Sequence, residues 1–468
     1  MKRFLWLGWV LFLLLICLGC GDTFRPVIIP NPPAFPDPRA SHTALALSNN
    51  GSVIGSAMVI NVTGDSKVSV ADCQEGSPCL GIAPVHAVQQ TATQVLVANQ
   101  GDILSKVAFS GTVIAAVTTI TMPSGSEPSF VSVLPSASTA YVALPGLVPD
   151  SGFPNNNAVG VVSTSSNSLT ATVMVGSNPA GIAETPDKAK VYVANRGRNA
   201  VPGSLTAFNT LDRSLRPLDL DGQPNPFVEP VLAAARSDNR RVYVLDRSAA
   251  ALVALDPTTQ AGTTDKVLHP VLNVGSSESM LYDSHLNRIY VPSGAQVSIV
   301  DVSSDIPNFL GNGGNPVPLA AFDPANRKSS DVCFGNTVTA LNAVAVAALP
   351  DGSRAYVGSF YQDGAGNICP QVTVINTSSN TVKTTIAVPG FANYDTFCAT
   401  ARFRFTMAAG GDSSRVYLAS CDSGSVHIID TSNDSYIAPL TAPPSARPPI
   451  PPSTQPPPQN PVFLIAGP

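Results

Sequence analysis

The chain has 468 residues, of which 44% are hydrophobic and 12% are charged. This composition differs from that of disordered chains and supplies enough apolar side chains for a large buried core. The formal net charge is −5, and it becomes −7 (24 basic against 31 acidic residues) when residues 1–19 are left out. We expect no nucleic-acid partner, because a chain of this charge has no basic surface to neutralise phosphates.

The first 19 residues have the pattern of an export signal. Lys2 and Arg3 precede an apolar run from Phe4 to Ile16, and Gly19 stands directly before Cys20. A membrane-spanning helix is the alternative, but it needs about 20 apolar residues and this run is shorter. The sequence therefore predicts a signal peptide at 1–19.

The end of this signal, Cys17 to Cys20, resembles the lipobox of bacterial lipoproteins. The resemblance implies lipid attachment at Cys20 and contact with a membrane through that lipid. Cys17 stands where Leu is usual, so an ordinary secreted protein is the alternative. Gly21, rather than Asp, follows the lipid-bearing residue, which in such lipoproteins implies the outer membrane. We expect a cell-envelope protein, with periplasmic and surface-facing orientations both open.

One strand pattern recurs along the rest of the chain. One copy of this pattern is Val191 to Asn195, and its β-branched and aromatic side chains are typical of a buried strand. A polar connector and an alternating segment, Ser204 to Asn209, follow it. Copies are centred on Leu96, Tyr141, Tyr243, Tyr290, Tyr356 and Tyr417. The steps from Leu96 through the six tyrosines are 45, 51, 51, 47, 66 and 61 residues. This period is that of propeller blades of four strands.

Prolines mark where the innermost strand of a blade begins. Four prolines lie 12 or 13 residues before the central residue of the recurring pattern, namely Pro84, Pro128, Pro179 and Pro230. Proline is tolerated at the first residue of a strand. Seven units are complete, whereas the unit at residues 43–61 lacks this strand. Residues 461–466 resemble residues 230–235, so we expect them to supply the missing strand and close the ring.

We therefore predict an all-β fold, a β-propeller of four-stranded antiparallel blades closed by a C-terminal strand. Eight blades are preferred; the alternative is seven blades with an N-terminal flap and a disordered C-terminal tail. The predicted organisation is a lipoprotein signal peptide at 1–19, a Pro-rich spacer at 20–41, the propeller at 42–441, a Pro-rich linker at 442–460 and the closing strand at 461–468.

The strand Tyr192 to Asn195 and its variants resemble the YVTN repeat of β-propeller proteins, over nearly all of residues 43–440. The resemblance implies the propeller fold. That fold is shared by lactonases, haem-binding domains and surface-layer proteins, so no single function is implied. The long insertions before Tyr356 and Tyr417 depart from a simple repeat.

Six cysteines remain when Cys17 and Cys20 are set aside. An even number in an exported chain indicates disulfides, although six cysteines allow 15 pairings. With the four strands of a propeller blade named a to d from the centre outward, the d-to-a and b-to-c connections emerge on the same face, and this register favours particular pairs. The predicted pairs are Cys333 with Cys369, Cys398 with Cys421, and Cys73 with Cys79. A zinc site is the alternative, but no Cys-x-x-Cys spacing supports it.

No catalytic set is found in the sequence. The histidines, His42, His86, His269, His285 and His427, are not at metal-ligand spacing. Both tryptophans lie in the signal, and neither a Cys-x-x-Cys-His haem motif nor a Gly-x-Ser-x-Gly elbow occurs. We expect no catalytic residue, no metal and no cofactor.

A polar cluster is the best candidate for ligand contact. Three of its residues come at the end of the recurring strand at Tyr192, namely Asn195, Arg196 and Arg198. The other two, Asp246 and Arg247, come at the end of the next copy, at Tyr243. They belong to b-to-c connections on the face that bears the disulfides, where arginines could hold carboxylates or sugar hydroxyls. The alternative is that they pair with neighbouring Asp residues or stay solvated.

The favoured function is binding: a monomeric, lipid-anchored disc that binds or organises an envelope protein or polysaccharide. The alternative is a lactonase-like or other hydrolase with a metal in the central channel. Three or more convergent carboxylates or imidazoles in the channel would favour the enzyme, and an apolar channel would favour binding.

Overall fold

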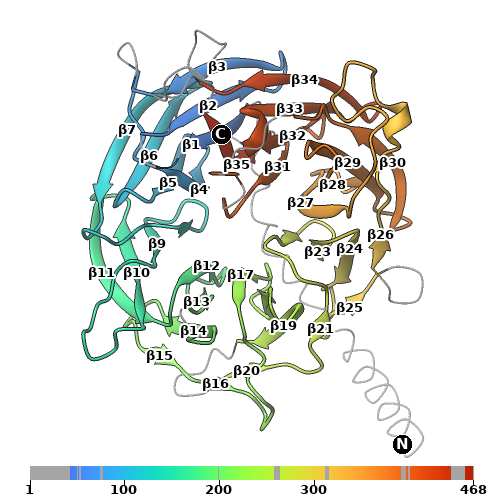
Figure 1. Ribbon diagram of the computed structural model, residues 1–468. Coiled ribbons are helices and arrows are strands. Elements are labelled where there is room, and N and C mark those ends of the chain that lie inside the picture. Colours follow the sequence, from blue (N-terminus) through green and yellow to red (C-terminus); the bar gives the residue numbers. More distant parts are fainter. Residues whose placement is uncertain are drawn as a thin grey trace, which may run out of the picture.

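The computed structural model describes residues 43–49, 51, 54–73, 77–198, 200–257, 264–310, 316–391, 397–398, 401–443 and 459–466. The predicted signal peptide, Cys20, the spacer at 20–41 and most of the linker at 442–460 lie outside these residues. Within the described ranges, no helix is both long and apolar enough to cross a membrane. Eight sheets stand in a ring around a central axis (Figure 1). The fold is an eight-bladed β-propeller, as predicted.

The first four blades have four strands each, named a to d from the axis outward. In blade 1 they are β35 (Asn460–Ala466), β1 (Thr43–Asn49), β2 (Ser56–Asn61) and β3 (Ser66–Ala71). In blade 2 they are β4 (Pro84–Thr91), β5 (Gln94–Asn99), β6 (Ile103–Ser110) and β7 (Val113–Thr121). In blade 3 they are β8 (Phe130–Ser132), β9 (Thr139–Leu144), β10 (Asn157–Ser163) and β11 (Ser168–Val175). In blade 4 they are β12 (Pro179–Glu184), β13 (Lys190–Asn195), β14 (Ser204–Asn209) and β15 (Leu215–Arg216).

The other four blades follow the same order, although two of them have a divided outer strand. Blade 5 has β17 (Pro230–Ala235), β18 (Val242–Asp246), β19 (Ala251–Asp256), β20 (Asp265–Val267) and β21 (Leu272–Asn273), and β16 (Leu218–Asp219) pairs with β20. Blade 6 has β22 (Leu281–Asp283), β23 (Arg288–Ser293), β24 (Gln296–Asp301), β25 (Asn308–Phe309) and β26 (Val317–Pro318). Blade 7 has β27 (Asn342–Ala348), β28 (Arg354–Gln362), β29 (Ile368–Asn376) and β30 (Thr381–Ala387). Blade 8 has β31 (Phe405–Ala409), β32 (Arg415–Ser420), β33 (Ser425–Asp430) and β34 (Ser435–Thr441). Two short 3-10 helices are η2 (Pro324–Asn326) and η3 (Cys421–Ser423).

The recurring Tyr-Val pattern forms strand b, which is buried on both faces. In β13, Val191 and Val193 pack into the core shared with blade 3, whereas Tyr192 packs into the core shared with blade 5. Successive side chains of a strand point to opposite faces, so each strand b must be apolar throughout. The cores therefore lie between neighbouring blades.

The ring closes through the C-terminal strand. β35 pairs antiparallel with β1, with Leu47 opposite Phe463 and Leu45 opposite Ile465. The side chain of Leu464 is buried and packs with residues of blades 1 and 8. Blade 1 therefore takes its innermost strand from the opposite end of the chain, and the predicted closure is confirmed.

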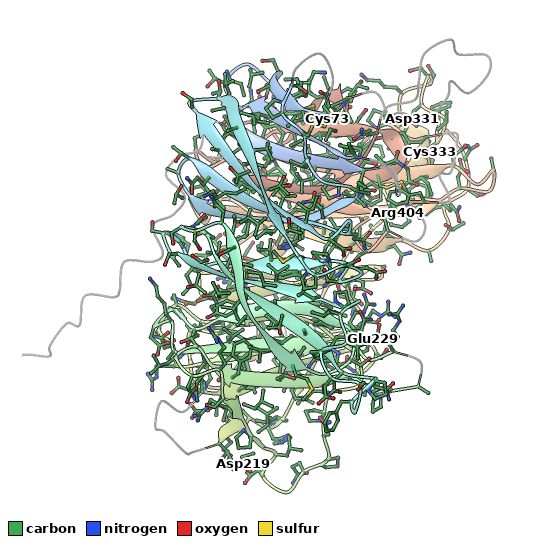
Figure 2. The ribbon with its side chains drawn as sticks, turned by 90° about the vertical axis from the view of Figure 1, so that its left-hand side faces the viewer. Cys73, Asp219, Glu229, Asp331, Cys333 and Arg404 are labelled. Carbon is green, nitrogen blue, oxygen red and sulfur yellow. A yellow bond between two sulfur atoms is a disulfide. The ribbon has the colours of Figure 1, made fainter. Side chains whose placement is uncertain are left out.

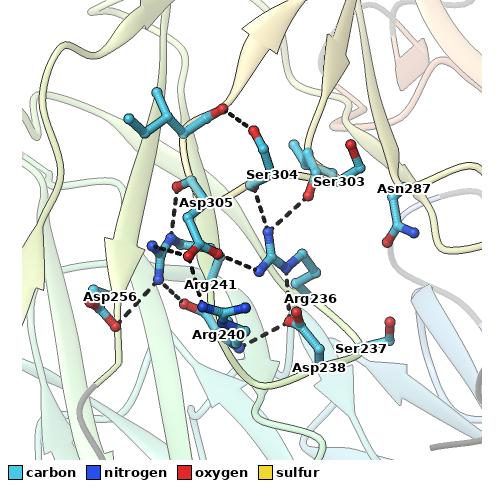
Figure 3. A network of polar contacts seen from close by, with 12 residues as sticks. Arg236, Ser237, Asp238, Arg240, Arg241, Asp256, Asn287, Ser303, Ser304 and Asp305 are labelled. Atoms are coloured by element: carbon cyan, nitrogen blue, oxygen red, sulfur yellow. Dashed lines mark hydrogen bonds and ion pairs between the residues drawn. The ribbon is translucent and has the colours of Figure 1, made fainter. Parts of the chain in front are cut away.

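Polar locks join successive blades at the rim of the disc. The turn between strands c and d of one blade receives a cation from the start of strand b of the blade before it. Arg354 pairs with Asp434 (2.6 Å) and Arg415 with Asp65 (3.0 Å). In the seam between blades 5 and 6, several arginines gather around Asp305 (Figure 3).

We predict that Leu464→Asp destabilises the ring. The carboxylate would lie in the core between blades 1 and 8, and burying it unpaired adds to the lost apolar burial. The free energy of unfolding should fall by about 3 kcal/mol or more. Thermal melting of the purified protein measures it.

Val113→Asp is the matched control, because this valine is exposed on the outer strand β7. It should change stability by no more than about 0.5 kcal/mol. Equal melting temperatures for the two variants would contradict the closure of the ring by β35.

Candidate functional site

All three disulfides lie on one face of the disc, the face formed by the d-to-a and b-to-c connections. Cys73 joins Cys79 between β3 and β4, Cys333 joins Cys369 at the start of β29, and Cys398 joins Cys421 after β32. These are the pairs that the repeat register predicts. Figure 2 shows Cys333, Arg404 and Glu229 in the right-hand half of the side view. We call this surface the braced face, and the opposite one the turn face.

The long connection before β27 is fixed to the braced face at several points. Besides the disulfide of Cys333, it holds the buried side chain of Arg327. The guanidinium donates to the carbonyl oxygens of Val388 (2.9 Å) and Pro370 (3.0 Å) and forms an ion pair with Asp331 (3.0 Å). Hydrogen bonds from a charged donor are among the stronger ones in proteins. The insertion before Tyr356 is therefore a pinned loop.

Asp363 stands beside this disulfide. Cys333, Asp363 and Cys369 form the only group of three possible metal ligands within 4.8 Å of one another in the described part of the chain. The two sulfur atoms are bonded to each other, so neither is a thiolate that could ligate zinc. The carboxylate of Asp363 instead accepts hydrogen bonds from Asn336 (2.7 Å) and Asn367 (2.8 Å). Burial opposes its charge, but these bonds hold the pKa of Asp363 below its ordinary value. The disulfide and the hydrogen bonds of Asp363 therefore stabilise the conformation of this loop.

Two of the predicted ligand contacts, Asn195 and Asp246, are buried and bonded within the chain. The amide of Asn195 donates to the carbonyl of Val193 (3.2 Å) and to the hydroxyl of Thr206 (3.0 Å). The carboxylate of Asp246 accepts from the backbone N–H of Val228 (2.7 Å). Both side chains stabilise connections of the braced face.

Arg196 and Arg247 converge on two glutamates from neighbouring d-to-a connections. Arg196 lies 2.8 Å from Glu229 and 2.7 Å from Glu278, and Arg247 lies 2.9 Å and 2.5 Å from the same two residues. Burial opposes charge on Glu229, but hydrogen bonds from Ser248 and Arg196 hold its pKa below the ordinary value. The two cations and two anions form a neutral network across blades 4, 5 and 6.

Arg196 and Arg247 therefore pair with acidic residues, as the alternative expected, but their partners are glutamates and not the expected aspartates. Arg198 does not join it, and no ion pair connects Arg198 to another described residue. That the five residues hold a ligand stays a prediction.

An arginine from the insertion before Tyr417 spans the channel. Arg402 donates to the carbonyl oxygens of Ala180 (2.6 Å) in blade 4 and Val231 (2.8 Å) in blade 5. Strand a is the inner edge of each blade, so such carbonyls have no partner strand. Burial lowers the pKa of Arg402 to about 10, and the guanidinium stays charged at neutral pH. Its donors satisfy two inner-edge carbonyls at once.

Aromatic rings pack around this arginine. Its guanidinium lies over the rings of Phe403 (4.9 Å) and Phe130 (5.9 Å). Phe403 contacts Phe463 of β35, and the ring of His86 stacks on Phe130 with centroids 3.8 Å apart. Burial holds the pKa of His86 well below its ordinary value, with Arg402 adding to the effect. Side chains of the protein therefore fill the channel at the braced face.

Three acidic or histidine residues lie on the eight innermost strands as described: His86, Glu184 and Asp283. They are not grouped within metal-ligand reach. His86 accepts from the backbone N–H of Val131 (3.4 Å), and Asp283 accepts from that of His285 (2.9 Å). Burial raises the pKa of Glu184, at the far end of β12, to about 7.

The sequence pattern did not reveal Glu229, Glu278 and Arg402. A signal for Glu229 was present, because it stands directly before Pro230, the residue that marks the start of a strand a. The register therefore puts it on the same face as Arg196 and Arg247. Arg402 had no comparable signal, because it bonds blades that are far away in the sequence.

No protein-family model matches the chain, and no curated protein matches its sequence. Two structures of AztD from Citrobacter koseri align with it at TM-scores of 0.55 and 0.54, with 10% and 11% identity over 90% of this chain and 96% of the other. A candidate 6-phosphogluconolactonase from Bacteroides uniformis aligns at a TM-score of 0.49, with 11% identity over 91% of this chain and 99% of its own. At such identities the similarity concerns the fold alone. The YVTN resemblance beyond the fold stays a prediction.

Glu184 should make stability depend on pH. The pKa of Glu184 is about 7 in the folded protein, against an ordinary value of 4.5. Its contribution to the free energy of unfolding is therefore complete below pH 4.5 and is lost as the pH rises to about 7. Glu184→Gln removes this loss. Relative to wild type, the variant should gain about 3 kcal/mol between pH 4.5 and pH 8.

Denaturant unfolding at a series of pH values measures this difference. Glu127→Gln, at an exposed position, is the control and should follow the wild-type curve at every pH. Parallel curves for Glu184→Gln and wild type would show that the carboxyl is ionised in the folded protein.

Proposed function

We propose that this propeller is a binding module of the cell envelope and that its braced face holds a partner protein. The observation that carries the proposal is the loop pinned by Arg327 and Cys333. On either side of this cysteine, Val332 and Phe334 are 38% and 44% exposed. A fixed loop loses little conformational entropy on binding, and aromatic anchors contribute much of the energy of protein interfaces.

Other exposed apolar side chains share this face. Among the described residues, 16 large hydrophobic side chains are exposed. Eight of them belong to the d-to-a or b-to-c connections, namely Ile54, Ile82, Val148, Phe153, Val228, Val332, Phe334 and Val338. Disulfides brace the loops near several of them. Exposed apolar side chains surrounded by a polar rim are typical of protein interaction surfaces.

The predicted lipid at Cys20 gives this module its location. Three disulfides suit an exported chain, because oxidised cysteines persist outside the cytosol. In this proposal the acylated Cys20 holds a monomeric disc at the outer membrane, and the braced face binds or organises an envelope protein.

The hydrolase alternative has less support. Enzymes on this fold need polar groups that converge in the channel. Here Arg402 and Phe403 occupy one end of the channel, and Glu184 lies at the other. No observation in the described ranges favours catalysis over binding.

A photo-crosslinking amino acid in place of Phe334 tests the proposal in cells that express the full chain. The matched control carries it in place of Leu211, which is 97% exposed in the c-to-d turn between β14 and β15, on the turn face. We expect a discrete crosslinked product of higher mass from position 334 and none from position 211. The same products from both positions, or none from 334, would contradict binding by the braced face.

A further inference from the structure

Four successive seams between blades share an arginine lock, and the one that lacks a carboxylate borders a cavity. Arginines at the start of strand b, or one residue before it, reach the next blade in four successive seams: Arg241, Arg288, Arg354 and Arg415. Each contacts the residue four positions after the Asn or Asp that ends strand c. That residue is Asp305, Asn380, Asp434 or Asp65 respectively. Of these four seams, only the one between blades 6 and 7 has an amide in this place.

The geometry of the lock is kept in this seam, but the charge is not. Arg288 donates to the side-chain oxygen of Asn380 (3.1 Å) and to the carbonyl of Thr377 (2.6 Å). Both Asn380 and Asp434 have left-handed backbone conformations, with φ of 54° and 53°. The amide of Asn380 is neutral, so it does not balance the charge of Arg288. No carboxylate among the described residues lies within ion-pair distance of this arginine.

A second possible counter-ion is also missing in this seam. Arg241 and Arg415 each lie 3.4 Å from the aspartate that ends strand c of their own blade, Asp256 and Asp430. The equivalent aspartate in the blade of Arg288 is Asp301, which accepts a hydrogen bond from the backbone N–H of Ser303 (2.9 Å) and forms no ion pair with Arg288. Among the described residues, Arg288 therefore has neither of the two counter-ions that occur in these other seams.

Next to it, the turn face is hollowed by a cavity of about 580 Å³. Arg288, Arg354 and Lys383 line it, together with Asn376, Ser378 and Ser432. Arg354 and Lys383 share the single carboxylate of Asp434, at 2.6 Å and 2.7 Å. Asp351 is nearby in the sequence, but it caps the backbone N–H of Ser353 (2.8 Å) and does not line the cavity. The residues that line the cavity thus include three cations and no carboxylate, and among the described residues Asp434 is the only anion in an ion pair with them.

We propose that this cavity binds an acidic saccharide, with the carboxylate of a sugar acid between Arg288, Arg354 and Lys383. Guanidinium groups bind carboxylates through paired hydrogen bonds. The hydroxyls of Ser378 and Ser432 donate to Asn376 (2.8 Å) and Asp430 (2.7 Å), so their oxygens can accept from sugar hydroxyls, and the amide nitrogen of Asn376 can donate to them. The volume is within the range of small-ligand sites, and an inorganic anion would fill only a small part of it. The site is on the turn face, so it does not depend on protein binding by the braced face.

Calorimetric titration of the full-length protein in detergent tests the proposal. The probes are a glucuronate-containing disaccharide, the neutral disaccharide of glucose, and inorganic phosphate. We expect the acidic disaccharide to bind, the neutral one to bind at least about tenfold more weakly, and added salt to weaken the binding. Binding of phosphate alone, of both sugars equally, or of no probe overturns the proposal.

Asn380→Asp gives the sharpest comparison, because it places in this seam the carboxylate that the other three seams already have. The variant should fold as wild type and lose about tenfold or more in affinity for the acidic disaccharide, since Arg288 is then neutralised. Asn167→Asp makes the same change at the equivalent turn position of blade 3, away from the cavity, and should bind within about twofold of wild type. Unchanged affinity in a folded Asn380→Asp variant overturns the assignment of the site.

Discussion

The ring depends on one pairing between distant parts of the chain, that of β1 with β35. Every other blade is built from consecutive strands, and local hairpins hold it together. Blade 1 alone joins residues near 45 to residues near 464. Without β35, β1 would present an open edge toward the axis, and blades 1 and 8 would lose the core around Leu464. This closure makes the disc a single body, on which loops can be held at fixed positions.

The same geometry leaves a second constraint, because the inner edge of each strand a has no partner strand. Arg402 meets part of this need by bonding carbonyls of blades 4 and 5 from a loop that belongs to blade 8. Phe403, Phe463 and Phe130 pack around it. Side chains of the chain itself therefore occupy the braced-face end of the channel. In our proposals, recognition uses the braced loops on one face and the cationic cavity on the other.

Most of the architecture could be predicted from the sequence, because the signals are local and repeated. The buried tyrosine of strand b gave the period, the prolines gave strand a, and the register of the cysteines gave the three disulfides. The polar site was less accessible. Arg196 and Arg247 were recognised, but their partner Glu278 and the plug at Arg402 depend on how insertions of different lengths cross the face. No spacing rule describes such contacts. The sequence around Asn380 also gave no sign of a binding site. The neutral amide at this position could be recognised only when the structure allowed the seams between blades to be compared.

The closure can be tested most directly by cutting the chain between blade 8 and β35. A recognition site for a specific protease, inserted within residues 444–458, allows the purified protein to be cleaved after folding. If β35 closes the ring, the C-terminal peptide stays with the ring through gel filtration under native conditions and separates only in denaturant. Separation of the peptide under native conditions, with the thermal stability of the remaining body unchanged, would contradict it.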